Sequence, residues 1–415
     1  MQFRRSTVLF VLALALVESG FSRIDGVESG FSRIDGVESG FSRIDGVESG
    51  FSRIDGVESG FSRITAAQAQ PSERDFLSRI RRLTIEGRRA GEGYWSKDGR
   101  QLVFQSEREP GNPFYQIYLM DMDSGNTTRV SPGTGKTTCA FINPETGDVL
   151  FASTHHDLRS KQLQDDELKF RASGQERRYS WDYDPEMELY IRSTQTGSYR
   201  RLTNRRGYDA EASFSPDGQW IVFSSTRDAY DRELSPAERK QLDTDPSYFG
   251  EIYIMRTDAD GAGARRLTTV TGYDGGPFFS PDGKRIVWRR FDEAGLIADV
   301  WTMNLDGTDQ RKITDFGAMS WAPYIHPSGE YIIFASNKLG FENFELFIVD
   351  IDGRKQPVRV TYTDGFDGLP VPSPDGRQLA WTSNRGGGRE GQIYLASWNH
   401  QAARAALKSA PARKP

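Results

Sequence analysis

One short motif recurs through most of this chain and constrains its fold more than any other feature. An apolar or aromatic residue is followed by Ser-Pro-Asp-Gly, or by a variant of it, and then by a short apolar run. Six copies begin at Trp95, Asn143, Phe214, Phe279, Ile325 and Pro372. Pro sets φ, Asp bonds to nearby backbone and Gly accepts a positive φ, so the motif predicts a tight turn between two strands.

A second motif marks the last strand of each repeat. It consists of a basic residue, an aliphatic residue and Thr or Ser, and it begins at Arg82, Arg129, Arg201, Arg266, Lys312 and Arg359. Alternating runs such as Glu251–Met255 lie between the two motifs and are typical of strands. Four strands in about 46 residues, where no loop is lengthened, form a propeller blade. The sequence therefore predicts an all-β, six-bladed β-propeller of four-stranded blades.

The two motifs are out of phase at the ends of the repeat region. Arg82–Thr84 precedes the first turn motif, whereas the sixth repeat, with strands near 379–381 and 392–395, lacks a fourth strand of its own. An N-terminal strand that completes the last blade would close the ring and remove two exposed sheet edges. We therefore expect the propeller to be closed in this way.

These repeats resemble the TolB-like six-bladed β-propeller repeat family, which includes the propeller half of TolB, over about residues 78–400. The resemblance implies an envelope or periplasmic binding protein. The sequence departs from TolB because residues 70–80 leave no room for the α/β domain that precedes the TolB propeller. Similar propellers also precede hydrolase domains, and the segment after Trp398 is too short for one. The resemblance thus supports the fold and the compartment more than a Tol–Pal role.

The first 69 residues have the pattern of an interrupted export signal. Arg4 and Arg5 precede an apolar run at 8–17, and Ala67-Gln68-Ala69 supplies a cleavage pattern. Between them a polar ten-residue unit is repeated from Val17 onward, and such copies cannot form a packed core. We expect a signal peptide interrupted by disordered repeats at 1–69, a linker at 70–80, the propeller at 81–400, a disordered tail at 401–415, and a periplasmic or secreted location.

Composition and motifs argue against several functions. A formal net charge of −5 gives no basic surface for nucleic acid, and Cys139 as the single cysteine allows neither an intramolecular disulfide nor a cysteine-based zinc site. Gly135-Lys136-Thr137 resembles the end of a phosphate-binding loop, but Val130 stands where its first glycine is required. No G-x-S-x-G elbow occurs. We therefore expect a non-catalytic, monomeric binding protein without a stable membrane span after signal removal.

Topology places the candidate binding surface at one rim of the ring. The innermost strands begin at the same rim that carries the loops from second to third strands, and two of these loops are long, at about 155–185 and 228–250. Ser235-Pro236-Ala237-Glu238 predicts a short helix in the second loop. Because binding residues concentrate on long loops of rigid scaffolds, we expect an envelope protein or peptide to contact this rim.

The candidate partner-binding residues share this rim. They are Glu92, Asp209, Glu211, Asp274, Asp367, Arg227, Arg385 and Trp321. The carboxylates stand at equivalent starts of innermost strands, where an acidic funnel would attract a cation or a basic peptide. Second strands end in arginines, at Arg108, Arg227, Arg289 and Arg385. These arginines could instead hold the carboxylates in structural ion pairs, and the two roles stay open from the residues alone.

A metal-dependent enzyme acting on acidic polysaccharide is the alternative function, because oligogalacturonate lyases also use propeller repeats. His155 and His156 would have to supply its metal site together with carboxylates. Adjacent residues of an extended segment point to opposite sides, so the pair is poorly arranged to chelate one ion. We expect no cofactor, with a divalent cation as the alternative. His326 takes the place of Ser in its turn motif, where a structural role is expected.

Overall fold

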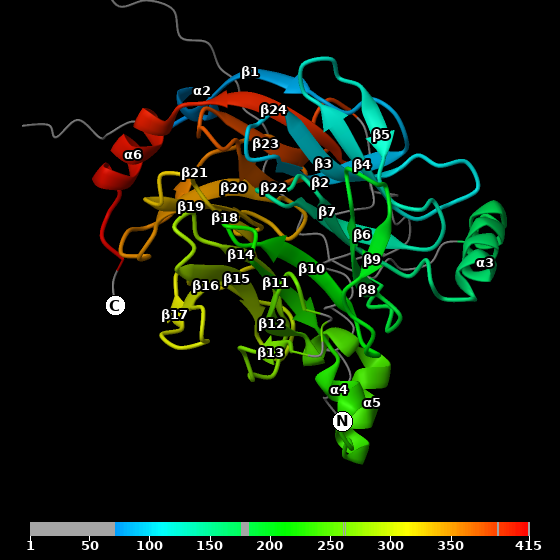
Figure 1. The fold of residues 1–415 in the computed structure, drawn as a ribbon. Helices are drawn as coiled ribbons and strands as arrows, with labels where there is room; N and C mark the ends of the chain where they lie inside the picture. Colours follow the sequence, from blue (N-terminus) through cyan, green and yellow to red (C-terminus); the bar gives the residue numbers. More distant parts are fainter. Residues whose placement is uncertain (1–70, 176–181, 260, 262, 388–389, 414–415) are drawn as a thin grey trace, which may run out of the picture. The chain divides into compact units, whose positions relative to one another are not determined.

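The computed structural model describes residues 71–175, 182–259, 261, 263–387 and 390–413, all of which belong to one of two compact units of the chain. Within them, six four-stranded antiparallel sheets follow one another around a ring (Figure 1). In every sheet the strand that comes first in the repeat is innermost. The predicted six-bladed β-propeller is confirmed.

The first five blades are continuous in sequence. Blade 1 comprises β2 (Arg89–Trp95), β3 (Gln101–Glu107), β4 (Gln116–Asp121) and β5 (Thr127–Arg129). Blade 2 comprises β6 (Thr137–Ile142), β7 (Val149–Ser153), β8 (Glu188–Arg192) and β9 (Tyr199–Arg201). Blade 3 comprises β10 (Asp209–Phe214), β11 (Trp220–Ser225), β12 (Glu251–Arg256) and β13 (Arg265–Arg266). Blade 4 comprises β14 (Asp274–Phe279), β15 (Arg285–Phe291), β16 (Ala298–Asn304) and β17 (Arg311–Lys312). Blade 5 comprises β18 (Ser320–Ile325), β19 (Tyr331–Ser336), β20 (Glu345–Asp350) and β21 (Val358–Arg359).

Blade 6 joins the two ends of the repeat region. Its inner strands are β22 (Asp367–Pro372), β23 (Gln378–Ser383) and β24 (Gln392–Trp398), and its outer strand is β1 (Leu77–Arg82). The register of β1 on β24 runs from Leu77 opposite Trp398 to Arg82 opposite Tyr394. Closure of the ring by an N-terminal strand is therefore confirmed, and the chain joins the ring at Leu77, inside the linker that was expected at 70–80.

The Pro-Asp-Gly turns are held by side chains of the motif itself. In blade 3 the Ser215 hydroxyl donates to Asp217 Oδ1 at 2.5 Å, and the Gln219 and Trp220 amides donate to Asp217 and Ser215. Gly218 follows at φ +68°. Ser and Asp make the same bond at 96 and 98, 280 and 282, and 373 and 375. The turn motif is thus held by hydrogen bonds between residues two to five positions apart.

The basic–aliphatic–Thr motif fastens the outermost strand to the third strand. In blade 3 the Arg266 guanidinium and the Thr268 hydroxyl both donate to Glu251, while the Ile252 amide donates to Thr268 Oγ1 at 2.9 Å. The same amide-to-hydroxyl bond recurs in the other blades, at Thr84, Ser131, Thr203, Thr314 and Thr361. Six short outer strands are therefore anchored by one repeated contact.

Helices occur at the rim loops and at the two ends of the described chain. They are α2 (Glu73–Phe76), α3 (Ser160–Ala172), α4 (Asp228–Asp231), α5 (Pro236–Thr244), the 3-10 helix η1 (Pro246–Phe249) and α6 (His400–Ser409). The helix predicted from Ser235 is α5, which has a capping box and Pro at its start. The disordered tail expected at 401–415 is wrong for residues 401–409, because Asn399 caps α6 and Ala403 and Leu407 are buried.

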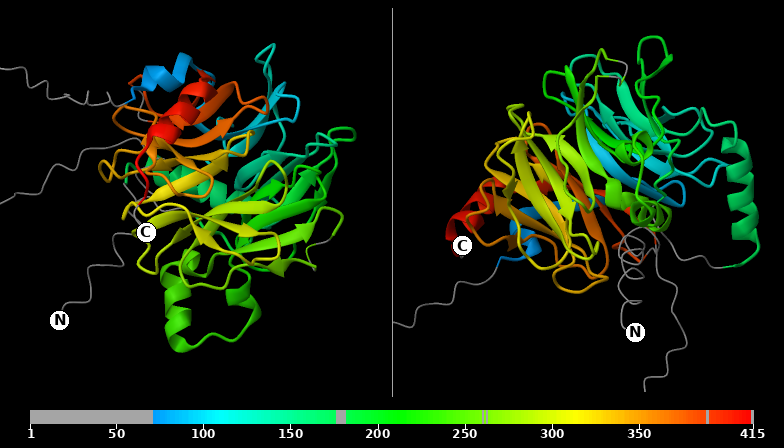
Figure 2. Two further views of the ribbon diagram at one scale, coloured as in Figure 1. Left: turned by 90° about the vertical axis from the view of Figure 1, so that its left-hand side faces the viewer. Right: turned by 90° about the horizontal axis from the view of Figure 1, so that it is seen from below.

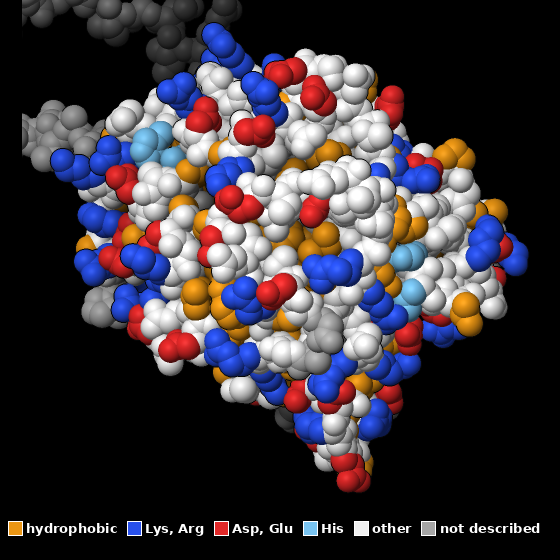
Figure 3. Space-filling view, viewed as in Figure 1, with side chains coloured by type: hydrophobic (Ala, Val, Ile, Leu, Met, Phe, Trp, Pro, Cys, Tyr) orange, Lys and Arg blue, Asp and Glu red, His pale blue; other side chains and the backbone are white. Residues whose placement is uncertain are grey.

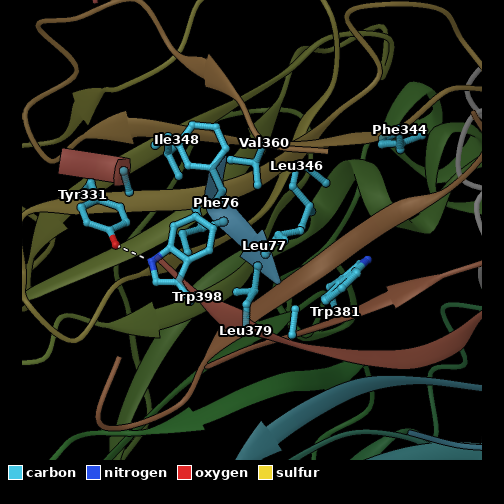
Figure 4. Packing of buried hydrophobic residues seen from close by; sticks show 14 of the residues in the cluster. Phe76, Leu77, Tyr331, Phe344, Leu346, Ile348, Val360, Leu379, Trp381 and Trp398 are labelled. Atoms are coloured by element: carbon cyan, nitrogen blue, oxygen red, sulfur yellow. Dashed lines mark hydrogen bonds between the residues drawn. The ribbon is translucent and has the colours of Figure 1, made fainter. Parts of the chain in front are cut away.

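The hydrophobic core follows the ring, and its largest cluster lies where the ring closes. Figure 4 shows Phe76, Leu77 and Trp398 packed together with core residues of blades 5 and 6, such as Leu346 and Leu379. The Phe76 and Trp398 rings stack with centroids 6.1 Å apart. Figure 2 shows α2 and α6 side by side at this seam. Residues from both ends of the repeat region therefore share one core.

Candidate functional site

The rim at which the innermost strands begin, called the long-loop rim from here on, carries most of the helices. The loop between β7 and β8 contains α3, and the loop between β11 and β12 contains α4, α5 and η1. Both loops join a second strand to a third strand, as expected. The six turn motifs lie at the opposite ends of the same strands, on what is called the turn rim.

Asp209 and Arg227 form a closed ion pair beneath the long-loop rim. The Asp209 side chain is 0% exposed and that of Arg227 is 3% exposed. Asp209 also accepts the Ser225 hydroxyl at 2.5 Å, and the Arg227 Nε group donates to Ser225 at 3.0 Å. Burial raises the pKa of Asp209, and Arg227 opposes that rise. This carboxylate is fully engaged by protein groups.

The equivalent carboxylates of blades 4 and 6 are engaged in the same way. Asp274 pairs with Arg290 at 2.7 Å and accepts the Trp288 indole N–H at 3.0 Å. Asp367 pairs with Arg385 at 2.6 Å and accepts the Trp381 indole N–H at 3.0 Å. Arg385 reaches Glu73 as well, at 3.1 Å. The expected carboxylate–arginine pairs are present, although the partner of Asp274 is Arg290 and not Arg289.

Arg289 instead crosses to Glu211 in the neighbouring blade, at 2.7 Å. Glu211 also accepts the Tyr273 hydroxyl at 2.5 Å, the Gly276 amide at 2.7 Å and the Ser224 hydroxyl at 3.0 Å. Burial works against ionisation of Glu211, yet Arg289 and these hydrogen bonds together lower its pKa. A Cβ atom at Gly276 would lie 2.0 Å from Arg289 Nη1, so glycine is required for this crossing.

Glu211 and Gly276 are two of six bulge positions, one in each innermost strand. One residue in each innermost strand has a left-handed conformation, with φ between 50° and 58°, and the strand register shifts there. The six are Glu92, Cys139, Glu211, Gly276, Ala322 and Leu369. The Glu92 amide donates to Thr382 Oγ1 in blade 6 at 3.3 Å. Burial, followed by the charge of Glu92, raises the pKa of the Cys139 thiol, which disfavours a nucleophilic thiolate.

Aromatic rings fill the centre of the propeller between these bulges and the turn rim. Tyr94 contacts Phe141 and Phe278 with ring centroids 5.4 Å away, and Phe278 contacts Tyr324 at 5.0 Å. These residues come from blades 1, 2, 4 and 5, so the rings pack across the axis. A ligand that reaches the bulge positions would therefore enter from the long-loop rim.

Trp321 and Tyr183 cover the buried network on the long-loop side. The Arg289 guanidinium lies 5.5 Å from the Trp321 ring centroid. Tyr183, from the loop after α3, packs edge-on against Tyr208 and Tyr273 at 5.0 and 5.5 Å. Sequence reasoning missed Tyr183 and Tyr273, because nothing in their local pattern indicates a contact between loops of different blades.

The two adjacent histidines face protein groups and not each other. Their rings are 6.3 Å apart and nearly perpendicular. His155 Nδ1 contacts Ser153 Oγ at 2.9 Å, while His156 Nδ1 contacts Tyr190 Oη at 3.0 Å. Burial is the main cause that lowers the pKa of His155 to about 4. No group of three His, Cys, Asp or Glu side chains suited to a metal ion occurs among the described residues.

Exposed apolar side chains gather on the long-loop rim. Eight large hydrophobic residues are exposed in loops or helices of this rim: Ile85, Leu158, Leu168, Val270, Ile297, Leu339, Phe341 and Tyr362. Two further exposed ones, Ile80 and Tyr199, lie on the outer strands β1 and β9. Figure 3 shows one face of the molecule, where charges of both signs are mixed. Across the described residues, the turn-rim loops contribute no exposed large hydrophobic side chain.

Comparison with protein families matches residues 242–409 to the TolB beta propeller domain. An uncharacterized protein of Agrobacterium fabrum is 26% identical over 194 residues, which are 45% of this chain and 58% of that protein. The Tol-Pal system protein TolB of Francisella tularensis subsp. mediasiatica is 23% identical over 193 residues, 40% of this chain and 44% of that protein. The chain thus spans about half the length of these curated relatives.

A solved structure supports the same fold. The putative TolB from Agrobacterium tumefaciens superposes with a TM-score of 0.50 and 20% identity, covering 75% of this chain and 90% of that chain. At this identity the likeness concerns the fold alone. The resemblance of the repeats to TolB-like propellers is therefore confirmed.

Proposed function

We propose that this chain is a non-catalytic binding scaffold of the cell envelope that presents its long-loop rim to a protein or peptide partner. The observation that carries the proposal is the position of the exposed apolar side chains, eight of which lie on that rim. Apolar groups exposed on one side of a rigid body favour association there, because burial removes them from water.

The buried ion pairs below the rim are proposed to support it. Asp209, Asp274 and Asp367 have side chains no more than 1% exposed and are already neutralised by arginines. A basic ligand would have to displace those arginines at a large desolvation cost. Partner contact is therefore proposed for the loops above them, with Glu92, Glu211, Arg227, Arg385 and Trp321 holding those loops in place.

The envelope location is proposed from two observations. Residues 1–69 carry the interrupted signal pattern, which lies outside the described residues, and one relative is a Tol-Pal system protein. In the described part of the chain, no helix has the length and apolar character needed to cross a bilayer. Among the described residues, His155 and His156 do not belong to a group of three side chains suited to a metal ion, so we do not propose the metal-dependent alternative.

Export of the chain should produce a mature protein that begins near Gln70. The apolar run at 8–17 and Ala67-Gln68-Ala69 act as two parts of one signal in this proposal. N-terminal sequencing of the exported protein checks this, with an Ala69→Leu variant as a control that blocks the small-residue site. A mature chain that retains several ten-residue units would contradict the proposed processing.

A photo-crosslinking amino acid at rim positions should capture the partner in cells that export the chain. Leu339, Phe341 and Ile297 are exposed on the long-loop rim and are suitable sites. We expect discrete adducts from these positions and none from the matched turn-rim positions Asp217, Lys284 and Arg377, because in the described residues the turn-rim loops carry no exposed large hydrophobic side chain. Gel shifts and mass spectrometry identify the adducts. Adducts that form only from the turn rim would place the binding surface on the opposite side.

A further inference from the structure

Two histidines from distant parts of the sequence stack where the C-terminal helix meets blade 5. His326 belongs to the turn before β19, and His400 is the first residue of α6. Their rings are 4.6 Å apart and 4° from parallel, and His326 also stacks on Tyr331 at 4.6 Å. Figure 3 shows His side chains in two separate groups, one of them near α6. A groove of about 600 Å³ runs beside this stack.

Hydrogen bonds hold His326 in its neutral form. The Ser328 amide, which can only donate, reaches His326 Nδ1 at 3.1 Å. Nδ1 must therefore be the unprotonated nitrogen, and Nε2 carries the hydrogen and faces the Gly376 carbonyl at 3.4 Å. The residue as a whole is 3% exposed. A proton added at Nδ1 would meet the Ser328 amide hydrogen, so protonation breaks the turn contact.

A second chain of hydrogen bonds connects Trp398 to His400 through Tyr331. The Trp398 indole N–H donates to Tyr331 Oη at 2.8 Å (Figure 4), and Tyr331 Oη is hydrogen-bonded to His400 Nδ1 at 3.0 Å.

The stack holds elements that close the ring. Asn399, next to His400, donates its backbone amide to Phe76 O at 2.9 Å and its side-chain amide to Asp75 O at 3.0 Å. Trp398 stacks on Phe76, directly before the closing strand β1. Release of His400 would therefore loosen α2 and β1 together with α6.

We infer that the stacked histidines make α6 an acid-sensitive latch, in which acidification undocks α6 from blades 5 and 6 and loosens the strand that closes the ring.

Two carboxylates near the stack are already engaged by other groups. Glu330 beside Tyr331 is paired with Arg404 of α6 at 2.7 Å. Asp375, in the groove, accepts the Ser373 hydroxyl at 2.6 Å and the Arg377 amide at 3.0 Å. Burial, followed by His400, lowers the pKa of His326 to about 4. The folded state therefore binds this proton less tightly than the unfolded state, so the stabilisation is present above about pH 6.5 and is lost as pH falls toward about 4.

Hydrogen–deuterium exchange of the full chain at pH 7.5 and pH 5.0, corrected for the intrinsic rate, tests the latch. We expect peptides covering 399–410 and 73–82 to exchange about 30-fold faster at pH 5.0, because that pH lies about 1.5 units below the pKa of a released histidine and above that of the docked one. Peptides covering β7 in blade 2 should keep their protection. Equal protection of α6 at both pH values would overturn the inference, as would acceleration of all blades together, which indicates global unfolding.

Two variants separate the latch from the other histidines. His326→Phe keeps an aromatic ring against Tyr331 and His400 but cannot be protonated, so the acid-induced acceleration should disappear. His156→Phe removes a histidine of the other group and should leave the acceleration as in the wild type. Because the wild-type comparison needs no substitution, the inference is tested even if α6 does not dock in His326→Phe. If the acid-induced acceleration were lost in His156→Phe, the acceleration would depend on the other histidine group and the inference would be overturned.

Discussion

Deletion of residues 78–86 is expected to lower the melting temperature sharply and to cause self-association. Most side chains of β1 are exposed, so its contribution comes from the backbone ladder with β24 and from the contacts that follow it. The Leu83 amide donates to Ile393 O at 2.7 Å, and the buried Thr84 hydroxyl donates to Gln392 at 2.8 Å. At about 1 kcal/mol for each lost bond, several bonds make up a large part of a typical stability of about 5–15 kcal/mol.

Thermal unfolding and size-exclusion chromatography with light scattering measure both effects. The exposed edge of β24 would be a template for another chain, so dimers or larger species should appear. Two single variants refine the test without deleting a strand. Thr84→Val removes the buried hydroxyl and should destabilise by about 1–3 kcal/mol, whereas Ile85→Ser alters a side chain that is 78% exposed and should change little. A truncated protein that stays monomeric with unchanged melting would contradict the importance of closure.

The fold was predictable from the sequence because its repeated signals are local. Ser215 and Asp217 hold their turn through neighbours two to five residues away, and Thr268 bonds to the third strand of its own blade. Such contacts recur in the same spacing wherever the motif occurs. Six copies therefore predict six blades and, through their phase, the closing strand.

The candidate site was predictable only in part, because its contacts depend on the register between strands and on contacts between blades. Arg289 and Arg290 are adjacent, so their side chains point to opposite faces of the sheet. The register of β15 against β14 therefore decides which of them reaches Asp274. The bulge at Gly276 shifts that register, and Arg289 then reaches Glu211 of blade 3. Helix α6 was missed because its short apolar stripe, Ala403 and Leu407, acquires meaning only when blades 5 and 6 are in place.

Replacing Asp209, Asp274 or Asp367 with Asn is expected to destabilise the protein strongly. Each substitution keeps the size of the side chain; Asp209→Asn and Asp274→Asn leave an arginine without its counter-charge, whereas Arg385 keeps Glu73 in Asp367→Asn, so that variant should lose less. Breaking such a pair from one side costs about 3–5 kcal/mol. The Arg227 side chain, for example, is 3% exposed and has Asp209 as its ion-pair partner. Urea unfolding of the three single variants measures the loss of free energy.

The matched controls are Asp217→Asn, Asp282→Asn and Asp375→Asn on the turn rim. These carboxylates are well exposed, with hydrogen bonds to Ser that lower their pKa, and the Asn oxygen can still accept the backbone N–H. Their effect on stability should therefore stay within about 1 kcal/mol. Crosslinking from Leu339 in the same variants then shows whether a substitution changes partner binding as well as stability. Loss of adducts in a rim variant whose unfolding free energy is unchanged would show that the carboxylates contact the partner, because a purely supporting pair cannot be lost without a loss of stability.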